Sequence, residues 1–311
     1  MIKILISEFM DEAAVASLRA EFETTYDATL VDRHEEMIAK LQDVDALIVR
    51  NRTQVNAQLL AAAPNLKVVG RLGVGLDNID MPACKARGVE VIPATGANAL
   101  AVAEYVIATA MLLLRGSFGS TTAVAAGQWP RSALSNGREI NGKTIGIVGF
   151  GGIGQLTARL AQGLGMRVVA NDPMIEAAAP VWGKTGVTCR TLDEVIAESD
   201  VLTLHIPLTP ETRNLISATR LASMKADAVL INSARGGIID ETALATALRG
   251  KQLGGAALDV FDDEPLKGGS PLAGCPNLIL TPHIAGVTTE SNTRVSSMIA
   301  QRVAAYLAAT R

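Results

Sequence analysis

Thr144-Ile-Gly-Ile-Val-Gly-Phe-Gly-Gly-Ile-Gly154 is the stretch that decides the fold of this chain. Its apolar beginning is typical of a buried strand, and Gly149, Gly151 and Gly154 follow at the spacing G-x-G-x-x-G. In such a turn the first glycine permits the tight bend and the second lets the backbone approach a pyrophosphate. The third allows a helix to pack closely on the strand. The stretch therefore predicts a strand, a phosphate-binding turn and the start of a helix, with Gly152 and Ile153 in the same turn.

An acidic residue completes this predicted unit. A helical pattern continues through Gly165, and a second apolar run, Arg167 to Ala170, leads to Asp172, which lies 18 residues after the last glycine. A carboxylate there accepts hydrogen bonds from the ribose hydroxyls of a dinucleotide. The next residues, 173–175, offer no cation for a 2′-phosphate, so NAD is favoured over NADP. The alternative is a glycine-rich turn that binds no nucleotide.

Composition excludes several classes of protein. The net charge of −3 and the pI of about 5.7 do not favour nucleic acid or an anionic membrane surface as a partner. No apolar run approaches the roughly 20 residues of a membrane span, and residues 1–7 read as a first strand rather than a signal peptide. Cys84, Cys189 and Cys275 show no metal-ligand spacing. We therefore expect a cytoplasmic protein with unpaired thiols and no metal site.

Short apolar runs alternate with helical patterns in two series, which is typical of parallel sheets with crossover helices. The first series has expected strands at Lys3–Ser7, Ala46–Val49, Val68–Gly70 and Val89–Ile92, and expected helices at Asp11–Glu21, Glu35–Gln42, Ala57–Ala63 and Met81–Arg87. The second has expected strands from Thr144 and at Arg167–Ala170, Val201–His205, Ala228–Ile231, Gly255–Val260 and Leu278–Leu280. The pattern predicts an α/β fold of two doubly wound parallel-sheet (Rossmann/flavodoxin-like) domains with a cleft between them.

The domain boundary is expected at Pro93–Asn98, where Pro, Gly and Asn interrupt the pattern. A helix then runs from Ala99 to about Arg115 and is apolar nearly all round, which indicates burial at a subunit interface. Residues 116–138 are polar and contain glycine, and we expect an arm rather than core. The last stretch, 290–311, has helical periodicity and is expected to return to the first domain.

Three polar residues lie in runs that contain Gly or Pro near the ends of expected strands. They are Arg235 in Asn232-Ser-Ala-Arg-Gly-Gly237, Glu264 in Asp262-Asp-Glu-Pro265 and His283 in Thr281-Pro-His-Ile-Ala-Gly286. Loops at strand ends commonly carry functional side chains. A cation, a carboxylate and an imidazole presented in this way can bind a carboxylate substrate and move one proton.

Together these runs resemble the D-isomer-specific 2-hydroxyacid dehydrogenase family along essentially the whole chain. The front half is similar to 3-phosphoglycerate dehydrogenases through Val49-Arg50 and the run Gly70–Asn78. The resemblance implies a substrate-binding domain of residues 1–97 plus 287–311, an NAD-binding Rossmann domain of residues 98–286, and a homodimer formed through the 98–140 region. The other matching motifs are Gly149–Gly154, Leu204–Leu208, Asn232–Gly237, Ala257–Phe261, Glu264-Pro265 and Pro282-His283.

Two departures from the family pattern qualify this resemblance. Gly152 stands where many relatives carry Arg or Lys, which removes a side-chain contact to pyrophosphate and leaves the backbone turn. The sequence ends at Arg311, so the regulatory domain of many phosphoglycerate dehydrogenases is expected to be missing, and serine feedback by that route with it.

The resemblance gives the three polar residues catalytic roles. Arg235 presents a planar, charged fork suited to the carboxylate of a 2-hydroxy or 2-keto acid. His283 is the proton carrier, a base during oxidation of the C2 hydroxyl and an acid during reduction of the ketone. Glu264 is expected to bind the His283 ring, fix its tautomer and raise its pKa.

Further cofactor contacts are implied by the same motifs. Asp259 is expected to meet the nicotinamide carboxamide, and the alternative is a carboxylate satisfied by backbone groups. His205 is expected to line the cofactor pocket, and a buried structural histidine is the alternative. The remaining expected cofactor-binding residues are Ile206, Pro207, Ser233, Ala234 and Gly286.

The substrate-binding residues are expected in the first domain. Gly73, Val74 and Gly75 can present backbone N–H groups to a carboxylate, and the prediction includes Asn98. Each of Arg50 and Arg71 follows an apolar strand run, and the resemblance assigns them to the distal anionic group of the substrate, whereas Arg52 stays open.

The distal group can be phosphate, sulfonate or carboxylate, so 3-phosphoglycerate-like and 3-sulfolactate-like acids are both candidates. The alternatives are a hydroxypyruvate/glyoxylate reductase or a D-lactate-type dehydrogenase. An alternative from a different class of protein is an NAD-sensing corepressor or scaffold.

Overall fold

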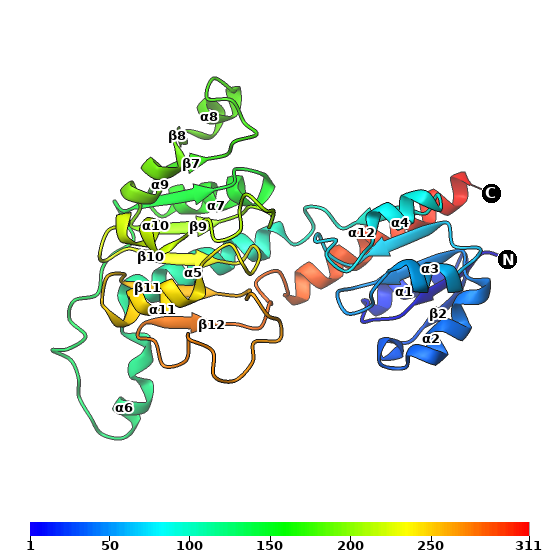
Figure 1. Cartoon of the computed structure of the whole chain (residues 1–311), viewed down its shortest axis with the longest axis horizontal. Helices are drawn as coiled ribbons and strands as arrows, with labels where there is room; N and C mark the ends of the chain where they lie inside the picture. Colours follow the sequence, from blue (N-terminus) through cyan, green and yellow to red (C-terminus); the bar gives the residue numbers. More distant parts are fainter. Residues whose placement is uncertain (311) are drawn as a thin grey trace. The chain divides into compact units, whose positions relative to one another are not determined.

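Two separate parallel sheets form the framework of the chain in the computed structural model, which describes residues 1–310. The first unit holds Met1–Asn98 together with the segment that begins at Val287, and the second unit holds Ala99–Gly286 (Figure 1). The chain therefore leaves the first unit after Asn98 and returns to it after Gly286.

The first unit contains a five-stranded parallel sheet in the order β2-β1-β3-β4-β5. This is a doubly wound order, whose direction of winding reverses between β1 and β3. The sequence predicted every strand except β2, which is short, polar and at the sheet edge. The strands are β1 (Lys3–Ile6), β2 (Glu23–Tyr26), β3 (Ala46–Val49), β4 (Val68–Arg71) and β5 (Glu90–Pro93).

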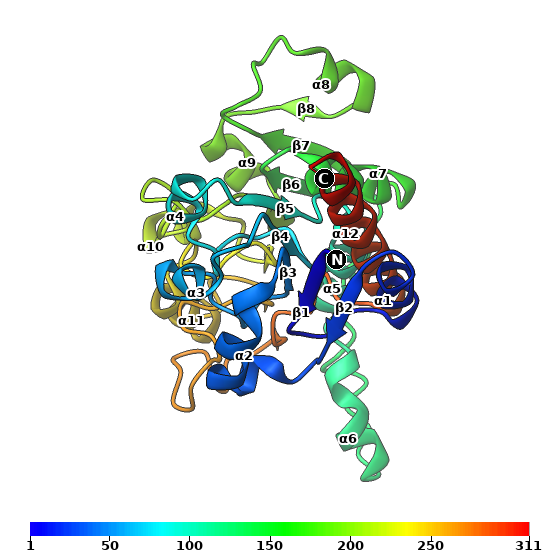
Figure 2. The same ribbon diagram turned by 90° about the vertical axis from the view of Figure 1, so that its right-hand side faces the viewer.

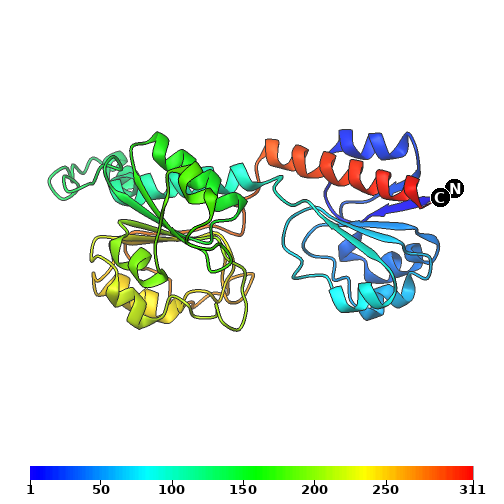
Figure 3. The same cartoon turned by 90° about the horizontal axis from the view of Figure 1, so that it is seen from above.

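Helices cover both faces of this first sheet. The long C-terminal helix α12 (Thr289–Ala309) and α1 (Glu12–Arg19) pack on one face (Figure 3). A Cβ at Gly70 would lie 2.8 Å from Ile299 and 2.9 Å from Val303, so a glycine in β4 lets α12 approach the sheet. The other face carries α2 (His34–Lys40), α3 (Ala57–Ala62) and α4 (Met81–Ala86), and the short turns η1 (Leu30–Asp32) and η2 (Leu41–Asp43) adjoin α2.

The second unit contains a seven-stranded parallel sheet in the order β12-β11-β10-β9-β6-β7-β8. Winding reverses between β6 and β9, which is the position where Rossmann folds bind dinucleotides. The two-residue edge strand β8 escaped prediction because it has no apolar run. The strands are β6 (Thr144–Val148), β7 (Arg167–Asn171), β8 (Thr188–Cys189), β9 (Val201–Leu204), β10 (Val229–Asn232), β11 (Gly255–Leu258) and β12 (Leu278–Leu280).

The predicted apolar helix is α5 (Ala99–Arg115), which packs with α7 (Gly152–Gly163) on one face of the second sheet. Its side chains Leu100, Met111 and Leu112 stay exposed. The predicted arm carries η3 (Phe118–Ser120) and α6 (Thr121–Ala125), neither of which has a buried residue (Figure 2). The remaining helices are α8 (Pro180–Thr185), α9 (Leu192–Glu198), α10 (Ala218–Ser223) and α11 (Glu241–Arg249).

Together these elements confirm the predicted α/β class with two doubly wound parallel sheets. Within residues 1–310, no single helix is long and apolar enough to cross a membrane. Within the same residues, the segments Ala99–Arg115 and Phe118–Ala125 are together long and apolar enough, but a 70° bend separates them.

Candidate active site

The glycine turn after β6 has the shape that a pyrophosphate needs. Gly149 has φ +92°, and a Cβ there would lie 2.4 Å from the carbonyl oxygen of His205. A Cβ at Gly154 would lie 2.3 Å from the Gly149 carbonyl oxygen. At Gly151 and Gly152, by contrast, a Cβ would meet nothing within 4 Å. Two glycines are therefore required by packing, and the other two leave the N-terminal end of α7 open to an anion.

Asp172, directly after β7, lies beside this turn. Its carboxylate accepts hydrogen bonds from the backbone N–H of Phe150 at 2.8 Å and of Met174 at 2.9 Å. No Lys or Arg among the described residues forms an ion pair with it. The carboxylate is thus fixed next to the glycines, as a ribose contact requires.

Ser233 gives an independent sign of a bound group. It follows β10, and its Oγ is buried without a hydrogen-bond partner among residues 1–310. Buried hydroxyl groups are rarely left unsatisfied in a folded protein. Together with the open glycine turn and Asp172, this atom fits a polar ligand such as NAD at the carboxyl ends of the strands.

His205 lies where the winding of the second sheet reverses. Its backbone N–H donates to the Val148 carbonyl at 2.7 Å, and its Nε2 lies 3.1 Å from Thr203 Oγ1. Burial lowers the pKa of His205 to about 4, so its ring is neutral near pH 7. His205 is thus an uncharged, anchored ring at the carboxyl ends of the strands, and it stays uncharged at neutral pH.

The lowered pKa of His205 makes stability depend on pH. The unfolded ring takes up a proton near pH 6.5, whereas the folded ring resists protonation down to about pH 4. The unfolded state therefore binds more protons in this window, and stability falls as pH falls from 6.5 toward 4, by up to about 3 kcal/mol. Urea unfolding at pH 7 and pH 5 should show a smaller loss for His205→Gln than for wild type. The exposed His34, changed to Gln as a control, should keep the wild-type loss.

His283 and Glu264 form a hydrogen-bonded pair after β12 and β11. Nδ1 of His283 lies 2.7 Å from Oε2 of Glu264, and the other oxygen, Oε1, accepts the Phe261 N–H at 3.1 Å. A carboxylate on Nδ1 favours the tautomer that carries its proton there, so Nε2 is left as the acceptor. With half of its side chain exposed, His283 can exchange a proton with a substrate.

Asp259 organises the turn that carries His283. It is 1% exposed and accepts hydrogen bonds from the backbone N–H of Ile284 at 2.8 Å, that of Ala285 at 2.7 Å, and the Thr281 hydroxyl at 2.6 Å. Its own carbonyl accepts the His283 N–H at 2.8 Å. These contacts correspond to the alternative of a carboxylate satisfied within the chain, and its contact with the nicotinamide stays a prediction.

Thr281 extends this network to α5. Its hydroxyl proton is donated to Asp259, so its oxygen accepts from the Tyr105 hydroxyl at 2.7 Å. Burial raises the pKa of Tyr105, and the phenol stays protonated as this donor. Sequence reasoning passed over both residues, because a Thr and a Tyr 176 positions apart share no local signal.

Arg235 follows β10 in a tightly held loop. Its Nη1 donates to the Ala234 carbonyl at 2.6 Å, and its own carbonyl accepts from Asn232 Nδ2 at 2.8 Å. The next residue, Gly236, packs against the loop that leads to Glu264. A Cβ at Gly236 would lie 1.7 Å from the carbonyl oxygen of Phe261. The structure thus places the Arg235 and Glu264 loops in direct backbone contact.

Gly236→Ala should therefore separate these two loops. The added methyl group meets backbone atoms rather than a flexible side chain, so one of the loops must move. Displacements of about 1 Å at reacting groups lower rates by about 100-fold. We expect kcat to fall on this scale in steady-state assays. Gly183→Ala, in α8 at a position where a Cβ meets nothing, is the matched control and should keep its fold and most of its activity.

In the first unit, Arg50 lies directly after β3. Its Nη2 donates to Asn292 Oδ1 at 2.8 Å, and its guanidinium lies 5.5 Å from the centre of the Phe9 ring. Burial lowers the pKa of Arg50, which nevertheless stays a cation at neutral pH. Arg52 instead forms an ion pair with Asp32. Arg50, unlike Arg52, forms no ion pair with a carboxylate among residues 1–310.

The end of β4 carries Arg71 and the glycine run. The Arg71 guanidinium covers Gly73, where a Cβ would lie 1.8 Å from Nη1. The Gly73 N–H already donates to the Arg71 carbonyl at 2.8 Å, so it cannot serve a ligand as predicted without rearranging. Among the described residues, the N–H groups of Val74 and Gly75 have no acceptor. Asn98, the last residue of this part of the unit, has a buried Oδ1 without a partner within residues 1–310.

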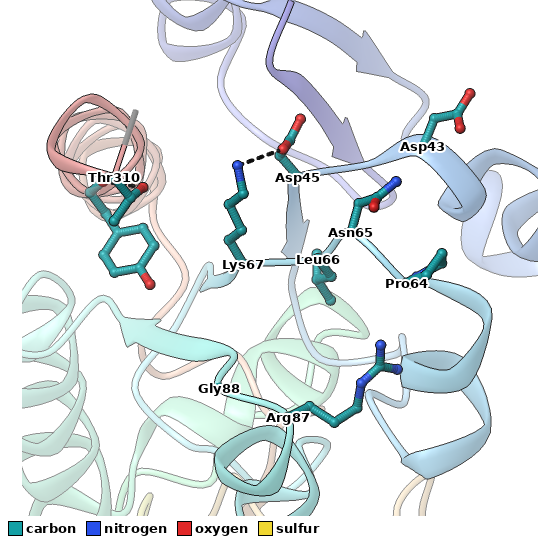
Figure 4. Close-up of a pocket in the computed structure, with 10 residues that line it drawn as sticks. Asp43, Asp45, Pro64, Asn65, Leu66, Lys67, Arg87, Gly88 and Thr310 are labelled. Atoms are coloured by element: carbon teal, nitrogen blue, oxygen red, sulfur yellow. Dashed lines mark hydrogen bonds and ion pairs between the residues drawn. The ribbon is translucent and has the colours of Figure 1, made fainter.

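An open pocket of about 610 Å³ lies at the amino-terminal ends of the strands of the first sheet (Figure 4). It is lined by residues that precede β3, β4 and β5, including Asp45 and Lys67, which form an ion pair at 3.1 Å. Ligands of doubly wound sheets bind at the carboxyl ends of the strands, and this pocket lies at the amino ends. It contains none of the predicted site residues.

Comparison with known proteins agrees with this geometry. Residues 107–285 match the family model of the D-isomer specific 2-hydroxyacid dehydrogenase NAD-binding domain. The chain is 53% identical over 296 residues to an (S)-sulfolactate dehydrogenase of Chromohalobacter salexigens, with 95% of each chain covered. It is 40% identical over 303 residues to a D-3-phosphoglycerate dehydrogenase of Synechocystis. That match covers 97% of this chain and 54% of the relative.

A solved structure shares the fold along nearly the whole chain. The NAD-dependent formate dehydrogenase of Staphylococcus aureus in complex with NAD superposes with a TM-score of 0.81 at 29% identity, and the match covers 99% of this chain and 96% of that one. The resemblance inferred from the sequence is confirmed, as is NAD as the cofactor. The chain belongs to the D-isomer specific 2-hydroxyacid dehydrogenases and is an NAD-dependent oxidoreductase.

Proposed function

We propose that this protein interconverts a 2-hydroxy acid and its 2-keto acid, and that its substrate carries a sulfonate or phosphate on C3. The pair His283–Glu264 at 2.7 Å carries the first part of the proposal, since it supplies a proton carrier with a fixed tautomer. Arg50 and Arg71, at the ends of adjacent parallel strands β3 and β4, carry the second part.

The residues of the second unit act at the carboxylate and at C2. Arg235 binds the substrate carboxylate through its guanidinium fork. His283 Nε2 takes the proton of the C2 hydroxyl during oxidation and returns it to the ketone oxygen during reduction. Glu264 holds the ring and stabilises the imidazolium. NAD supplies the hydride acceptor or donor.

The cofactor is held by residues at the carboxyl edge of the second sheet. Backbone N–H groups of the glycine turn bind the pyrophosphate, and Asp172 binds the ribose hydroxyls. Ser233 supplies a buried hydroxyl to the bound dinucleotide. His205 lines the pocket as a neutral ring. We assign Ile206, Pro207, Ala234 and Gly286 to the same pocket wall on their positions after β9, β10 and β12.

The first unit recognises the distal anion of the substrate and adds backbone donors to the carboxylate that Arg235 binds. The unused N–H groups of Val74 and Gly75 bind its carboxylate, and Asn98 contributes a polar side chain at the end of the unit. Arg50 and Arg71 bind the distal anion. A sulfonate is favoured because the chain is 53% identical to the sulfolactate dehydrogenase and 40% identical to the phosphoglycerate dehydrogenase.

A substrate panel tests the proposed function. kcat/KM should be measured for sulfopyruvate, phosphohydroxypyruvate, oxaloacetate, hydroxypyruvate and pyruvate, with wild type and Arg71→Ala. Each charge-assisted hydrogen bond is worth about 1.5–3 kcal/mol, so the tailed acids should exceed pyruvate by at least about 10-fold, and Arg71→Ala should lower their kcat/KM by about 10-fold or more relative to pyruvate.

Three outcomes contradict parts of this proposal. If pyruvate is the best substrate, or if Arg71→Ala leaves the ranking unchanged, the anionic-tail assignment fails. If the protein binds NADH yet reduces no 2-keto acid, an NAD-sensing corepressor or scaffold becomes the better interpretation.

We also propose a homodimer that forms through residues 98–140, in the cytoplasm. Several large apolar side chains of this region are exposed, including Phe118 at 62% and Trp129 at 78%. Sedimentation should give twice the chain mass of 32.5 kDa. Phe118→Glu combined with Trp129→Glu should yield monomers, whereas dimers of unchanged stability would contradict this interface.

The three unpaired cysteines support the proposed cytoplasmic location, because thiols stay reduced in that compartment.

A further inference from the structure

Glu8, directly after β1, is a buried carboxylate that the catalytic residues do not use. It is 4% exposed and lies where the winding of the first sheet reverses between β1 and β3. An isolated buried carboxylate is strongly unfavourable unless its oxygens are hydrogen-bonded. Its presence at this position therefore needs a structural or functional reason.

The reason is the loop that follows β3. Glu8 Oε1 accepts the backbone N–H of Arg50 at 2.9 Å and that of Thr53 at 3.0 Å. Its Oε2 accepts the N–H of Arg52 at 3.0 Å and that of Asn51 at 3.3 Å. Burial raises the pKa of Glu8, but these backbone donors outweigh it and hold the pKa below its usual value. Four successive N–H groups thus close around an internal anion.

The same loop is fixed from its other side. Ser7 Oγ lies 3.0 Å from Thr53 Oγ1, and Asn78 Nδ2 donates to the Thr53 carbonyl at 2.7 Å. These contacts hold the end of the loop, whereas Glu8 alone bonds to every N–H from Arg50 to Thr53. Removal of the carboxylate would leave four backbone N–H groups without their acceptor, which favours opening of the loop toward solvent.

Arg50 is the residue whose position depends on this clamp. Its side chain extends from the clamped backbone to the Phe9 ring, at 5.5 Å, and to Asn292 on α12, at 2.8 Å. Phe9 follows Glu8 in the chain, so the clamp and the ring move together. The clamped backbone, the Phe9 ring and the Asn292 side chain together fix the direction of the Arg50 guanidinium. This guanidinium forms no ion pair with a carboxylate among the described residues.

We propose that Glu8 is a positioning residue that presents Arg50 to the anionic tail of the substrate. It does not touch the substrate, because its four carboxylate contacts all go to the loop backbone. This inference rests on the proposed function, since it assumes that Arg50 binds a sulfonate or phosphate. It predicts that loss of Glu8 weakens tail recognition and leaves chemistry at C2 unchanged.

Steady-state kinetics of Glu8→Ala test the proposal. KM for sulfopyruvate should rise by about 10- to 100-fold, the value of one charge-assisted hydrogen bond, while kcat and the KM for pyruvate change by less than about 3-fold. Glu8→Asp keeps the charge and should recover part of the affinity. Formate or acetate, added to Glu8→Ala as a replacement anion, should lower the KM for sulfopyruvate again.

Asp45 offers a matched control in the same unit. Its carboxylate accepts the Lys3 N–H at 2.9 Å and pairs with Lys67 at the opposite edge of the sheet. Asp45→Ala should leave the KM for both substrates unchanged, even where its melting temperature falls as far as that of Glu8→Ala. Equal increases in KM for sulfopyruvate and pyruvate in Glu8→Ala, or no increase in either, would overturn the positioning role.

Hydrogen exchange separates this inference from the proposed function. The amides of residues 50–53 should exchange much faster in Glu8→Ala than in wild type without any substrate, and unchanged protection would contradict the clamp. If wild type reduces pyruvate better than any tailed acid, the proposed substrate class fails. The exchange data still decide whether Glu8 holds the loop.

Discussion

His283→Asn should lower kcat for reduction of the 2-keto acid by about 10²- to 10⁴-fold, which is the contribution of a positioned acid–base group. Nε2 of His283 is the nitrogen left free by the contact of Nδ1 with Glu264, and asparagine cannot deliver a proton from that position. The dinucleotide contacts lie at the glycine turn and at Asp172, so NADH should bind to the variant with nearly wild-type affinity. Rapid-mixing kinetics and NADH fluorescence titration measure the two effects separately.

Two further variants locate the cause of this loss. Glu264→Gln keeps a hydrogen-bond acceptor for Nδ1 but removes the charge that stabilises the imidazolium, so its loss should be smaller than that of His283→Asn. Thr281→Val removes the hydroxyl between Tyr105 and Asp259. It tests whether this hydroxyl must hold the turn that carries His283 for full catalytic activity. Activity of His283→Asn within about 3-fold of wild type would exclude His283 as the proton carrier.

Arg235→Lys should lower kcat/KM by about 10- to 150-fold, although the positive charge is retained. The planar fork makes two parallel hydrogen bonds to a carboxylate, and an ammonium group cannot reproduce both. Loss of one charge-assisted bond at about 1.5–3 kcal/mol accounts for this range. The measurement is kcat/KM for the same keto acid with and without the substitution.

Arg213 is the matched control for this substitution. It is exposed, and its Nη1 forms an ion pair with Asp262 at 3.4 Å, in the loop that also carries Glu264. Arg213→Lys should retain nearly full activity, because exposed ion pairs contribute little. Equal losses for the two variants would show that Arg235 acts through loop structure rather than through the substrate carboxylate.

The framework was predictable because parallel strands buried on both faces are continuous apolar runs. β3, β6 and β9 are such runs, and the glycines after β6 marked the dinucleotide turn directly. β2 and β8 were missed because edge strands need no apolar run. The boundaries of the two series of strands were accurate to within about two residues, which is the usual disagreement at element ends.

The site was only partly predictable for a physical reason. Arg235, Glu264 and His283 lie in motifs with Gly or Pro, which mark loops in any sequence. Glu8, Thr281, Tyr105 and Asn292 act through contacts that join distant parts of the chain, and only the folded sheet brings them together. The tight contact of Gly236 with Phe261 likewise depends on two adjacent strands ending side by side.

Deuterium transfer from C2 of 3-sulfolactate to NAD is a direct measure of the proposed reaction. The purified protein should be incubated with NAD and the acid deuterated at C2, and the NADH and keto acid formed should be analysed by mass spectrometry. We expect one deuterium in the reduced nicotinamide for each sulfopyruvate formed, and almost none with His283→Asn in the same time. Bound NAD without deuterium transfer from any 2-hydroxy acid, with or without an anionic tail, would contradict the proposed reaction.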